Sequence, residues 1–107
     1  MKIAVRAISP KKLREFSSKY VDAATPLKAW FKLIKNGRYG NLADLKKTFG
    51  SVDLVPVKRK NKTVDYFVFN IGGNKYRLVA TIHFNAQLLF VRDVLTHQDC
   101  DTGGWKK

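Results

Sequence analysis

The stretch Phe67–Leu78, FVFNIGGNKYRL, decides the fold of this chain. Alternating apolar residues flank two adjacent glycines, a pattern that predicts a strand, a tight reversal at Gly72–Gly73 and a second strand. Lys75 and Arg77 stand at the start of the second strand. Because a hairpin determines which side chains share a sheet face, we expect the functional residues on the face that carries Arg77.

The period-two pattern continues beyond this hairpin. It predicts antiparallel strands at 64–71, 75–84 and 88–94. A turn around Asn85–Ala86 joins the last two, and Lys2–Ile8 alternates well enough to add an N-terminal strand to the same sheet. Upstream of these strands, Ser51–Lys62 is expected to be an irregular segment that ends in the basic run VKRKNK.

Helix signals fill the N-terminal half of the chain. The pairs Ser9–Pro10 and Thr25–Pro26 are each typical of an N-cap followed by the first helical residue. One apolar stripe marks the second helix: Leu27, Trp30, Phe31 and Ile34. Asn41 can cap a short third helix that ends at Gly50. The sequence thus predicts an α+β domain, with two to three N-terminal helices packed on one face of an antiparallel β-sheet.

Strand register sorts the sheet residues into two faces. With Gly72–Gly73 as the whole loop, Val68 lies opposite Arg77, and the next hairpin puts Arg92 opposite Val79. The apolar face, which the helices must cover, carries Phe67, Phe69, Ile71, Tyr76, Leu78, Ala80, Ile82, Leu89, Val91 and Leu95. The other face, called the arginine face below, carries Tyr66, Val68, Asn70, Lys75, Arg77, Val79, Thr81, His83, Phe90, Arg92 and Val94. No helix of the predicted set remains to cover the arginine face.

Arg77 and Arg92 are predicted on neighbouring strands of the arginine face, with Tyr66 close by. Two guanidinium groups on a rigid sheet form a bidentate clamp for a phosphate. Like charges on adjacent strands cost stability, and this cost points to a missing anion. The alternative is that each arginine only extends over apolar neighbours into solvent. His83 lies at the far end of the face, by the turn, and is expected to be incidental.

His97 follows the last strand in the segment LTHQDCD. Thr96 can cap a turn there, and Asp99 and Asp101 are near enough to influence the imidazole. Histidine titrates near neutral pH and is the usual proton-transfer group, although a lone histidine more often has no catalytic role. Its position after the strand that bears Arg92 makes His97 the histidine to test.

The charge balance points to a polyanionic ligand. The chain has 107 residues, which predicts a single domain, and 21 Lys and Arg against 8 Asp and Glu give a formal net charge of +13. RNA or DNA is the first candidate for such a surface, although excess charge also keeps a protein soluble. A tail at about 101–107 is expected to be loose. We expect a cytoplasmic protein with no membrane contact, because no long apolar run or signal-peptide pattern is present.

Three pieces of the chain together resemble the HigB family of bacterial type II toxins, which have a RelE-like fold. They are AWFKLIK in the second predicted helix, the hairpin VFNIGGNKYRLV and the ending FVRDVLTHQDCD. The residues that match by position are Asn70, Gly72, Gly73, Asn74, Tyr76, Arg77, Arg92, Thr96, His97 and Asp101. The family usually ends in TH-x-E-Y-D, whereas this chain has Asp99 and Cys100 in place of the glutamate and the tyrosine.

The resemblance implies an mRNA interferase that cleaves translated messages at the ribosome and is neutralised by a HigA-like antitoxin with a helix-turn-helix domain. We expect Arg77, Arg92 and His97 to be catalytic, through attack of the ribose 2′-OH on its own phosphate. The residues expected to bind RNA are Tyr66, Asn74, Lys75, Lys58, Arg59 and Lys60.

No metal or other cofactor is expected, because the carboxylates are few and scattered and Cys100 is the single cysteine. Two other functions stay open at this point. A non-catalytic RNA-binding module could use the same basic face. A DNA-binding regulator would need a recognition-helix pattern that the sequence does not show.

Overall fold

The computed structural model describes residues 6–8, 10–73, 75–103 and 105. Within this part of the chain, five strands form one sheet in the order β1-β5-β4-β3-β2. The strands are β1 (Arg6–Ile8), β2 (Asp53–Arg59), β3 (Lys62–Ile71), β4 (Tyr76–His83) and β5 (Leu88–Thr96). The helices are α1 (Pro10–Lys19), the short 3₁₀ helix η1 (Val21–Ala23), α2 (Ala24–Asn36), α3 (Leu42–Thr48) and α4 (His97–Thr102).

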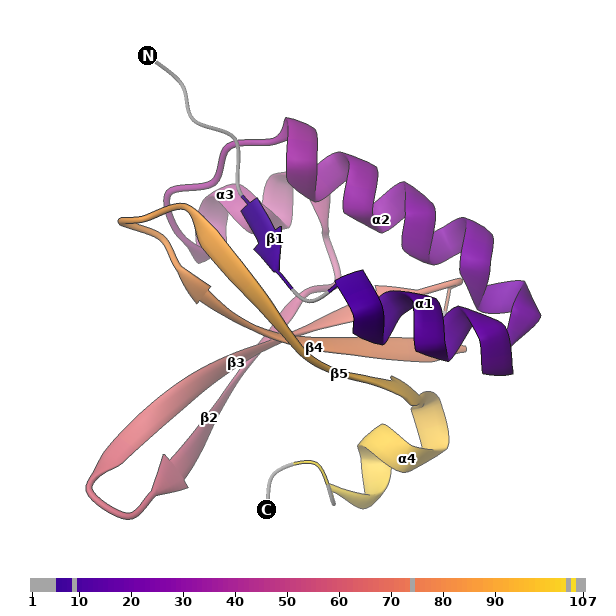
Figure 1. Ribbon diagram of the computed structural model, residues 1–107. Helices are drawn as coiled ribbons and strands as arrows, with labels where there is room; N and C mark the ends of the chain where they lie inside the picture. Colours follow the sequence, from indigo (N-terminus) through magenta and orange to yellow (C-terminus); the bar gives the residue numbers. More distant parts are fainter. Residues whose placement is uncertain (1–5, 9, 74, 104, 106–107) are drawn as a thin grey trace.

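The helices lie on both sides of the sheet. α1, α2 and α3 cover one face, and α4 lies on the opposite side (Figure 1). β1 pairs in parallel with β5, whereas β2 to β5 form antiparallel pairs. The predicted α+β architecture is confirmed, including the N-terminal strand for residues 6–8; residues 2–5 of that prediction lie outside the described part. None of the described helices is long and apolar enough to cross a membrane.

The core lies between α2 and the sheet. Leu27, Trp30 and Ile34 of α2 are buried, which confirms the predicted apolar stripe. The Trp30 ring packs edge-on against Phe69 of β3, with 5.4 Å between ring centroids. Burying one large apolar side chain stabilises a fold by about 1.5–3 kcal/mol. This stripe therefore anchors the helical layer to the strand that precedes the glycine reversal.

The predicted helix starts had different outcomes. Asn41 caps α3 as expected, because its side-chain oxygen accepts a hydrogen bond from the Asp44 N–H at 3.0 Å. The prediction of Thr25 as an N-cap is wrong: η1 continues directly into α2, so Thr25 already belongs to the first helical turn. Pro26 is tolerated there because the N–H groups of a first turn have no partner within the helix. The predicted cap Ser9 lies outside the described residues.

The interpretation of Ser51–Lys62 as irregular is wrong. Asp53–Arg59 forms β2, which pairs with β3 along its whole length and turns back between Arg59 and Lys62. The sequence did not indicate this strand, because a proline and a run of basic residues are unusual within strands. Pro56 is tolerated because β2 is the last strand of the sheet and one of its edges needs no ladder donors. The β2–β3 hairpin extends well beyond the helices, as Figure 1 shows.

The glycine reversal has four loop residues, not two. Ile71 pairs with Tyr76, so Arg77 lies opposite Asn70 rather than opposite Val68 as predicted. This shift of two residues leaves the paired side chains of β3 and β4 on their predicted faces, because alternation has a period of two. The prediction that Lys75 begins the second strand on the arginine face is wrong, since Lys75 lies in the loop and its ammonium bonds Asp22 of η1. Gly72 and Gly73 both have positive φ angles, 63° and 71°, which glycine adopts at little cost.

A β-bulge divides the register between β4 and β5. From His83–Leu88 to Ala80–Val91 the pairs match the prediction, but Val79 then pairs with Asp93, and Arg92 is the extra residue. The prediction that Arg92 lies opposite Val79 is therefore wrong. Beyond the bulge the faces exchange on β5: Val94 joins the core at 8% exposure, and Leu95 pairs with Arg77. These two residues correct the predicted face assignment, because one inserted residue reverses the alternation that follows it.

We expect Gly73→Ala to lower the free energy of unfolding by about 1–2 kcal/mol, because a left-handed conformation brings Cβ too close to the backbone carbonyl oxygen. A Cβ at Gly73 meets no atom within 4 Å, so the loss reports backbone conformation alone. Chemical denaturation measures it. Gly50→Ala is the matched control, since its φ is not in the left-handed range and its Cβ also meets open space. Equal effects at the two sites would contradict the role assigned to the glycine reversal.

Candidate active site

The arginine face is closed at its centre. Val68 and Val79 pair with each other there and are only 6% and 1% exposed. The Trp105 ring packs edge-on against Tyr66, with 5.4 Å between ring centroids, and α4 lies on the same side of the sheet (Figure 1). The expectation that no helix covers this face is wrong, because the chain folds back through α4 after β5. The predicted loose tail at 101–107 likewise begins inside α4, and Trp105 is docked.

Arg77 lies near the start of β4 and is half-buried. It stands between Asn70 of β3 and Leu95 of β5. Its Nη1 atom donates a hydrogen bond to the Tyr76 carbonyl oxygen at 3.2 Å. This bond keeps the guanidinium at the end of the sheet where the glycine reversal and α4 also lie.

His97 is the first residue of α4. The Thr96 hydroxyl oxygen accepts a hydrogen bond from the Asp99 N–H at 3.1 Å, so Thr96 caps the turn as predicted. The backbone N–H of His97 donates to the Lys75 carbonyl at 2.9 Å. Its imidazole Nε2 lies 3.1 Å from Asp101 Oδ2. The imidazole is thus held by an acid one helical turn away, beside the loop that carries Lys75.

Asp22 ties the same loop to the helical layer. Its two carboxylate oxygens accept hydrogen bonds from the Tyr76 hydroxyl at 2.5 Å and from Lys75 Nζ at 3.3 Å. Lys75 is therefore held from both ends, through its side chain by Asp22 and through its carbonyl by His97. Arg77 and His97 thus lie at the end of the sheet where this loop reverses, whereas the Lys75 ammonium is bound to Asp22 on the helical side.

This network shifts two pKa values in opposite directions. The hydrogen bond from Tyr76, followed by that from Lys75, lowers the pKa of Asp22 below its ordinary 3.8. The same bond to a carboxylate raises the pKa of Tyr76 to about 12 from its ordinary 10.0. Sequence reasoning missed Asp22. The sequence feature that could have indicated it is the scarcity of acidic residues in this part of the chain, since Asp22 is one of two before Asp44.

Arg92 lies apart from Arg77. Its Nε donates to the Thr81 hydroxyl at 2.9 Å, and its guanidinium carbon lies 5.0 Å from the Phe90 ring centroid. Thr81 is four residues beyond Arg77 on β4, about 13 Å along the strand. The structure thus holds Arg92 on the arginine face but does not bring its guanidinium to that of Arg77. Phe90 also contacts His83, edge-on, with 5.5 Å between ring centroids.

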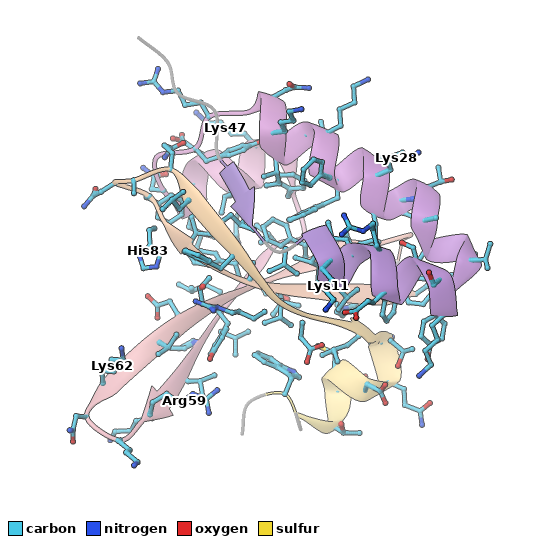
Figure 2. The ribbon with its side chains drawn as sticks, viewed as in Figure 1. Lys11, Lys28, Lys47, Arg59, Lys62 and His83 are labelled. Atoms are coloured by element: carbon cyan, nitrogen blue, oxygen red, sulfur yellow. The ribbon has the colours of Figure 1, made fainter. Side chains whose placement is uncertain are left out.

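A second basic region lies on the β2–β3 hairpin. Lys58 and Lys60 are exposed there, and Figure 2 shows Arg59 and Lys62 far out on this hairpin. Arg59 Nη2 donates to the Tyr66 hydroxyl at 3.0 Å. Four of the predicted RNA-binding residues therefore lie on this hairpin, namely Lys58, Arg59, Lys60 and Tyr66, and Lys75 lies apart from them. Asn74, the remaining predicted contact, lies outside the described residues.

Among the described residues, no three His, Cys, Asp or Glu side chains gather in a way that could hold a metal ion. The acids near the basic groups have other partners. Asp22 accepts from a lysine and a tyrosine, and Asp101 lies against an imidazole. The chemistry that this arrangement offers is cationic binding of a polyanion, with an imidazole at one end of the surface.

An α+β domain with α1, α2 and α3 on one sheet face and basic side chains on the other is suited to binding a polyanion. The chain matches the family model described as HigB_toxin, RelE-like toxic component of a toxin-antitoxin system, over residues 23–103. The chain belongs to this family, and the predicted family and RelE-like fold are confirmed.

Named relatives cover most of the chain. It is 34% identical over 94 residues to the mRNA interferase toxin HigB of Escherichia coli (strain K12), which covers 88% of this chain and 86% of that protein. The same values hold for the mRNA interferase HigB of Shigella flexneri. Identity to the mRNA interferase HigB of Escherichia coli O6:H1 (strain CFT073) is 28% over the same shares.

We expect the Asp22–Tyr76 bond to make stability depend on pH at both extremes. Because the pKa of Tyr76 is raised, its contribution to the free energy of unfolding is complete below its ordinary pKa of 10.0. This stabilisation is lost as the pH rises from 10 to about 12. The lowered pKa of Asp22 means that its contribution is present above about 3.8 and is lost as pH falls further.

Unfolding free energies of wild type, Tyr76→Phe and Asp22→Asn, measured across pH, check this expectation. The stability difference between wild type and Tyr76→Phe should shrink from pH 10 to 12, and Asp22→Asn should lose the acid dependence. A difference that stays constant from pH 8 to 12 would show that the hydroxyl makes no bond to a carboxylate in solution.

Proposed function

We propose that this protein is the mRNA-cleaving toxin of a toxin–antitoxin pair, an endoribonuclease that acts in the cytoplasm on translated messages. Its relatives are named mRNA interferases. The observation that supports the proposal is that Arg77 and His97 stand at the same end of the sheet: Arg77 pairs with Leu95, and the His97 N–H donates to the carbonyl of the loop residue Lys75. A cation for the phosphate and an imidazole for proton transfer are the two groups that RNA cleavage at neutral pH needs.

The proposed reaction uses the RNA's own ribose. A base removes the proton of a 2′-OH, the 2′-oxygen bonds to the adjacent phosphorus, and the bond from phosphorus to the 5′-oxygen breaks. The departing 5′-oxygen takes up a proton, so the products are a 2′,3′-cyclic phosphate and a 5′-hydroxyl. Arg77 stabilises the negative charge that grows on the phosphate oxygens. His97 moves one of the two protons.

The second proton has three candidate carriers, Lys75, Tyr66 and Asp99. Lys75 is next to His97 through its backbone carbonyl, whereas the Tyr66 hydroxyl accepts a bond from Arg59 on the β2–β3 hairpin. Lys75 is thus the nearer of these two along the backbone, but its ammonium would have to release Asp22 to carry the proton. Arg92 would have to release Thr81 to join a clamp on the cleaved phosphate. We assign it to RNA beyond that phosphate.

The reaction is proposed to need no metal ion. Cationic side chains supply the charge that a metal would otherwise bring to the phosphate. Activity should therefore persist in a chelator such as EDTA.

Two macromolecular partners are proposed besides mRNA. A HigA-like antitoxin with a helix-turn-helix domain would neutralise the toxin, since the family is defined as one half of a toxin–antitoxin system. The ribosome would present the message, and the exposed lysines of the β2–β3 hairpin would contact RNA backbone during that encounter.

We expect His97→Ala to lower the cleavage rate by about 10²- to 10⁴-fold, the usual contribution of a positioned acid or base, while RNA binding stays intact. Arg77→Ala should lose about 10²- to 10³-fold, because it removes charge stabilisation from the transition state. Mapping cut sites on one message, with and without ribosomes and in the presence of EDTA, measures both losses.

Lys28→Ala on α2 is the matched control, since Lys28 is exposed on the helical side of the molecule (Figure 2). A wild-type protein that binds RNA but cleaves none under either condition would support the non-catalytic RNA-binding alternative instead. Loss, in a chelator, of the cleavage that the protein shows without ribosomes would overturn the metal-independent reaction. Only that condition tests it, because a chelator also removes the Mg²⁺ that ribosomes need.

We expect Lys58→Ala with Lys60→Ala to weaken RNA binding and to reduce its salt dependence. Each phosphate contact to a single strand contributes about 0.7 to the slope of log affinity against log salt, so the double variant should lose about 1.4. Titrations at several salt concentrations measure the slope. Lys28→Ala with Lys32→Ala removes the same charge from α2 and should leave the slope unchanged.

A further inference from the structure

The far end of the arginine face carries a group of side chains that the cleavage mechanism does not use. Phe90 of β5 pairs with Thr81 of β4, and His83 lies two residues further along β4 on the same face. His83 and Arg92 are exposed, and Phe90 is half-buried. Figure 2 shows His83 near the turn between β4 and β5.

Ring and cation contacts connect these side chains. The Arg92 guanidinium lies on the Phe90 ring, 5.0 Å from its centroid, and is oriented by the Thr81 hydroxyl. The His83 ring meets Phe90 at an interplanar angle of 89°. A guanidinium, a phenyl ring and an imidazole thus form one continuous surface, which is called the Phe90 site below.

Packing does not explain the Phe90 site. Phe90 is not part of the hydrophobic cluster between the helices and the sheet. Among the described residues, no carboxylate pairs with Arg92. The β-bulge makes Arg92 the extra residue of β5, and bulges often redirect a side chain next to a functional site. A bulge that presents an arginine over an aromatic ring, with no acid to neutralise it, suits an anionic ligand.

A hollow of about 740 Å³ lies beside the Phe90 site. His83, Leu88 and Phe90 line it from the strands, and Asn85 and Ala86 line it from the turn. Its volume falls in the range of about 300–1,000 Å³ that is usual for small-molecule sites. Aromatic side chains and arginine planes are the groups on which unpaired RNA bases stack.

We propose that the Phe90 site binds one unpaired nucleotide of the RNA substrate, with its base stacked on the ring surface and its phosphate near Arg92. This inference rests on the proposed RNA-cleaving function and adds a second contact point to it. It also gives His83 a role, as the edge-on support of the Phe90 ring.

The distance to the cleavage site determines which nucleotide is bound. Arg77 and Thr81 are about 13 Å apart along β4. A stacked strand advances about 3.4 Å per nucleotide and an extended one about twice as far, so this distance equals roughly two to four nucleotides. The bound nucleotide therefore lies outside the cleaved step and serves to hold the RNA in register.

Binding of two RNAs of equal length tests the Phe90 site. One is an unstructured octamer with 2′-O-methyl groups, which block attack by the ribose oxygen. The other has the same backbone without bases. Phe90→Ala should weaken binding of the base-containing RNA by about 5- to 150-fold, the effect of losing one base–aromatic stack. It should leave the abasic RNA unchanged, whereas Arg92→Ala should weaken both.

Two further variants separate stacking from folding. Phe90→Leu keeps apolar volume without a ring and should behave like Phe90→Ala, and Phe90→Trp should restore wild-type affinity. Lys28→Ala should change neither RNA. Equal losses of Phe90→Ala on the two RNAs, no loss on either, or no RNA binding by the wild type would overturn the site. These binding measurements do not depend on cleavage. A protein that binds the two RNAs as expected but cuts no message in the cleavage assay therefore contradicts the proposed activity and leaves the Phe90 site intact.

Discussion

The register of β4 places its apolar side chains against the helices and Arg77 on the opposite face. β4 is paired on both sides, with β3 and with β5. The direction in which each β4 side chain points therefore also determines which side chains of the two neighbouring strands lie on the same face. Tyr76, Leu78 and Ala80 face the helices and are buried, whereas the residues between them face the other way. A slip of one residue would expose the apolar set and bury Arg77 beneath α2. The hydrophobic core and the basic face are thus two results of one alignment.

The scarce acids of this basic chain are used for positioning. Asp22 holds Lys75 and Tyr76, and Asp101 lies against the His97 imidazole. Both acids stand at the same end of the sheet, Asp22 on its helical side and Asp101 in α4. Around Arg92, at the other end, no described carboxylate forms a pair. One end is therefore organised by internal hydrogen bonds, whereas the cation at the other end has no acidic partner among the described residues.

Local patterns predicted much of the fold because local physics controls them. The α2 stripe, the Asn41 and Thr96 caps and the faces of β3 and β4 all depend on residues within a few positions of one another. β2 could not be predicted, because an edge strand with a proline and a basic run is specified by its partner strand. The start of α2 was also misplaced, since a 3₁₀ turn extended the helix past a strong capping signal.

At the candidate site, the sequence pattern is enough to predict which residues of β4 share a face and that Arg77 points away from the core. The alternation of apolar residues with a period of two on one face leads to that conclusion. Only the folded chain places Arg92 at a bulge with Phe90 and brings Asp22 into a hydrogen bond with Tyr76, 54 positions away. A bulge is stabilised by contacts of both strands, and a bond across such a separation depends on the packing of α1 and α2. Neither the bulge nor this bond produces a periodic pattern of residues, so neither could be predicted from the sequence.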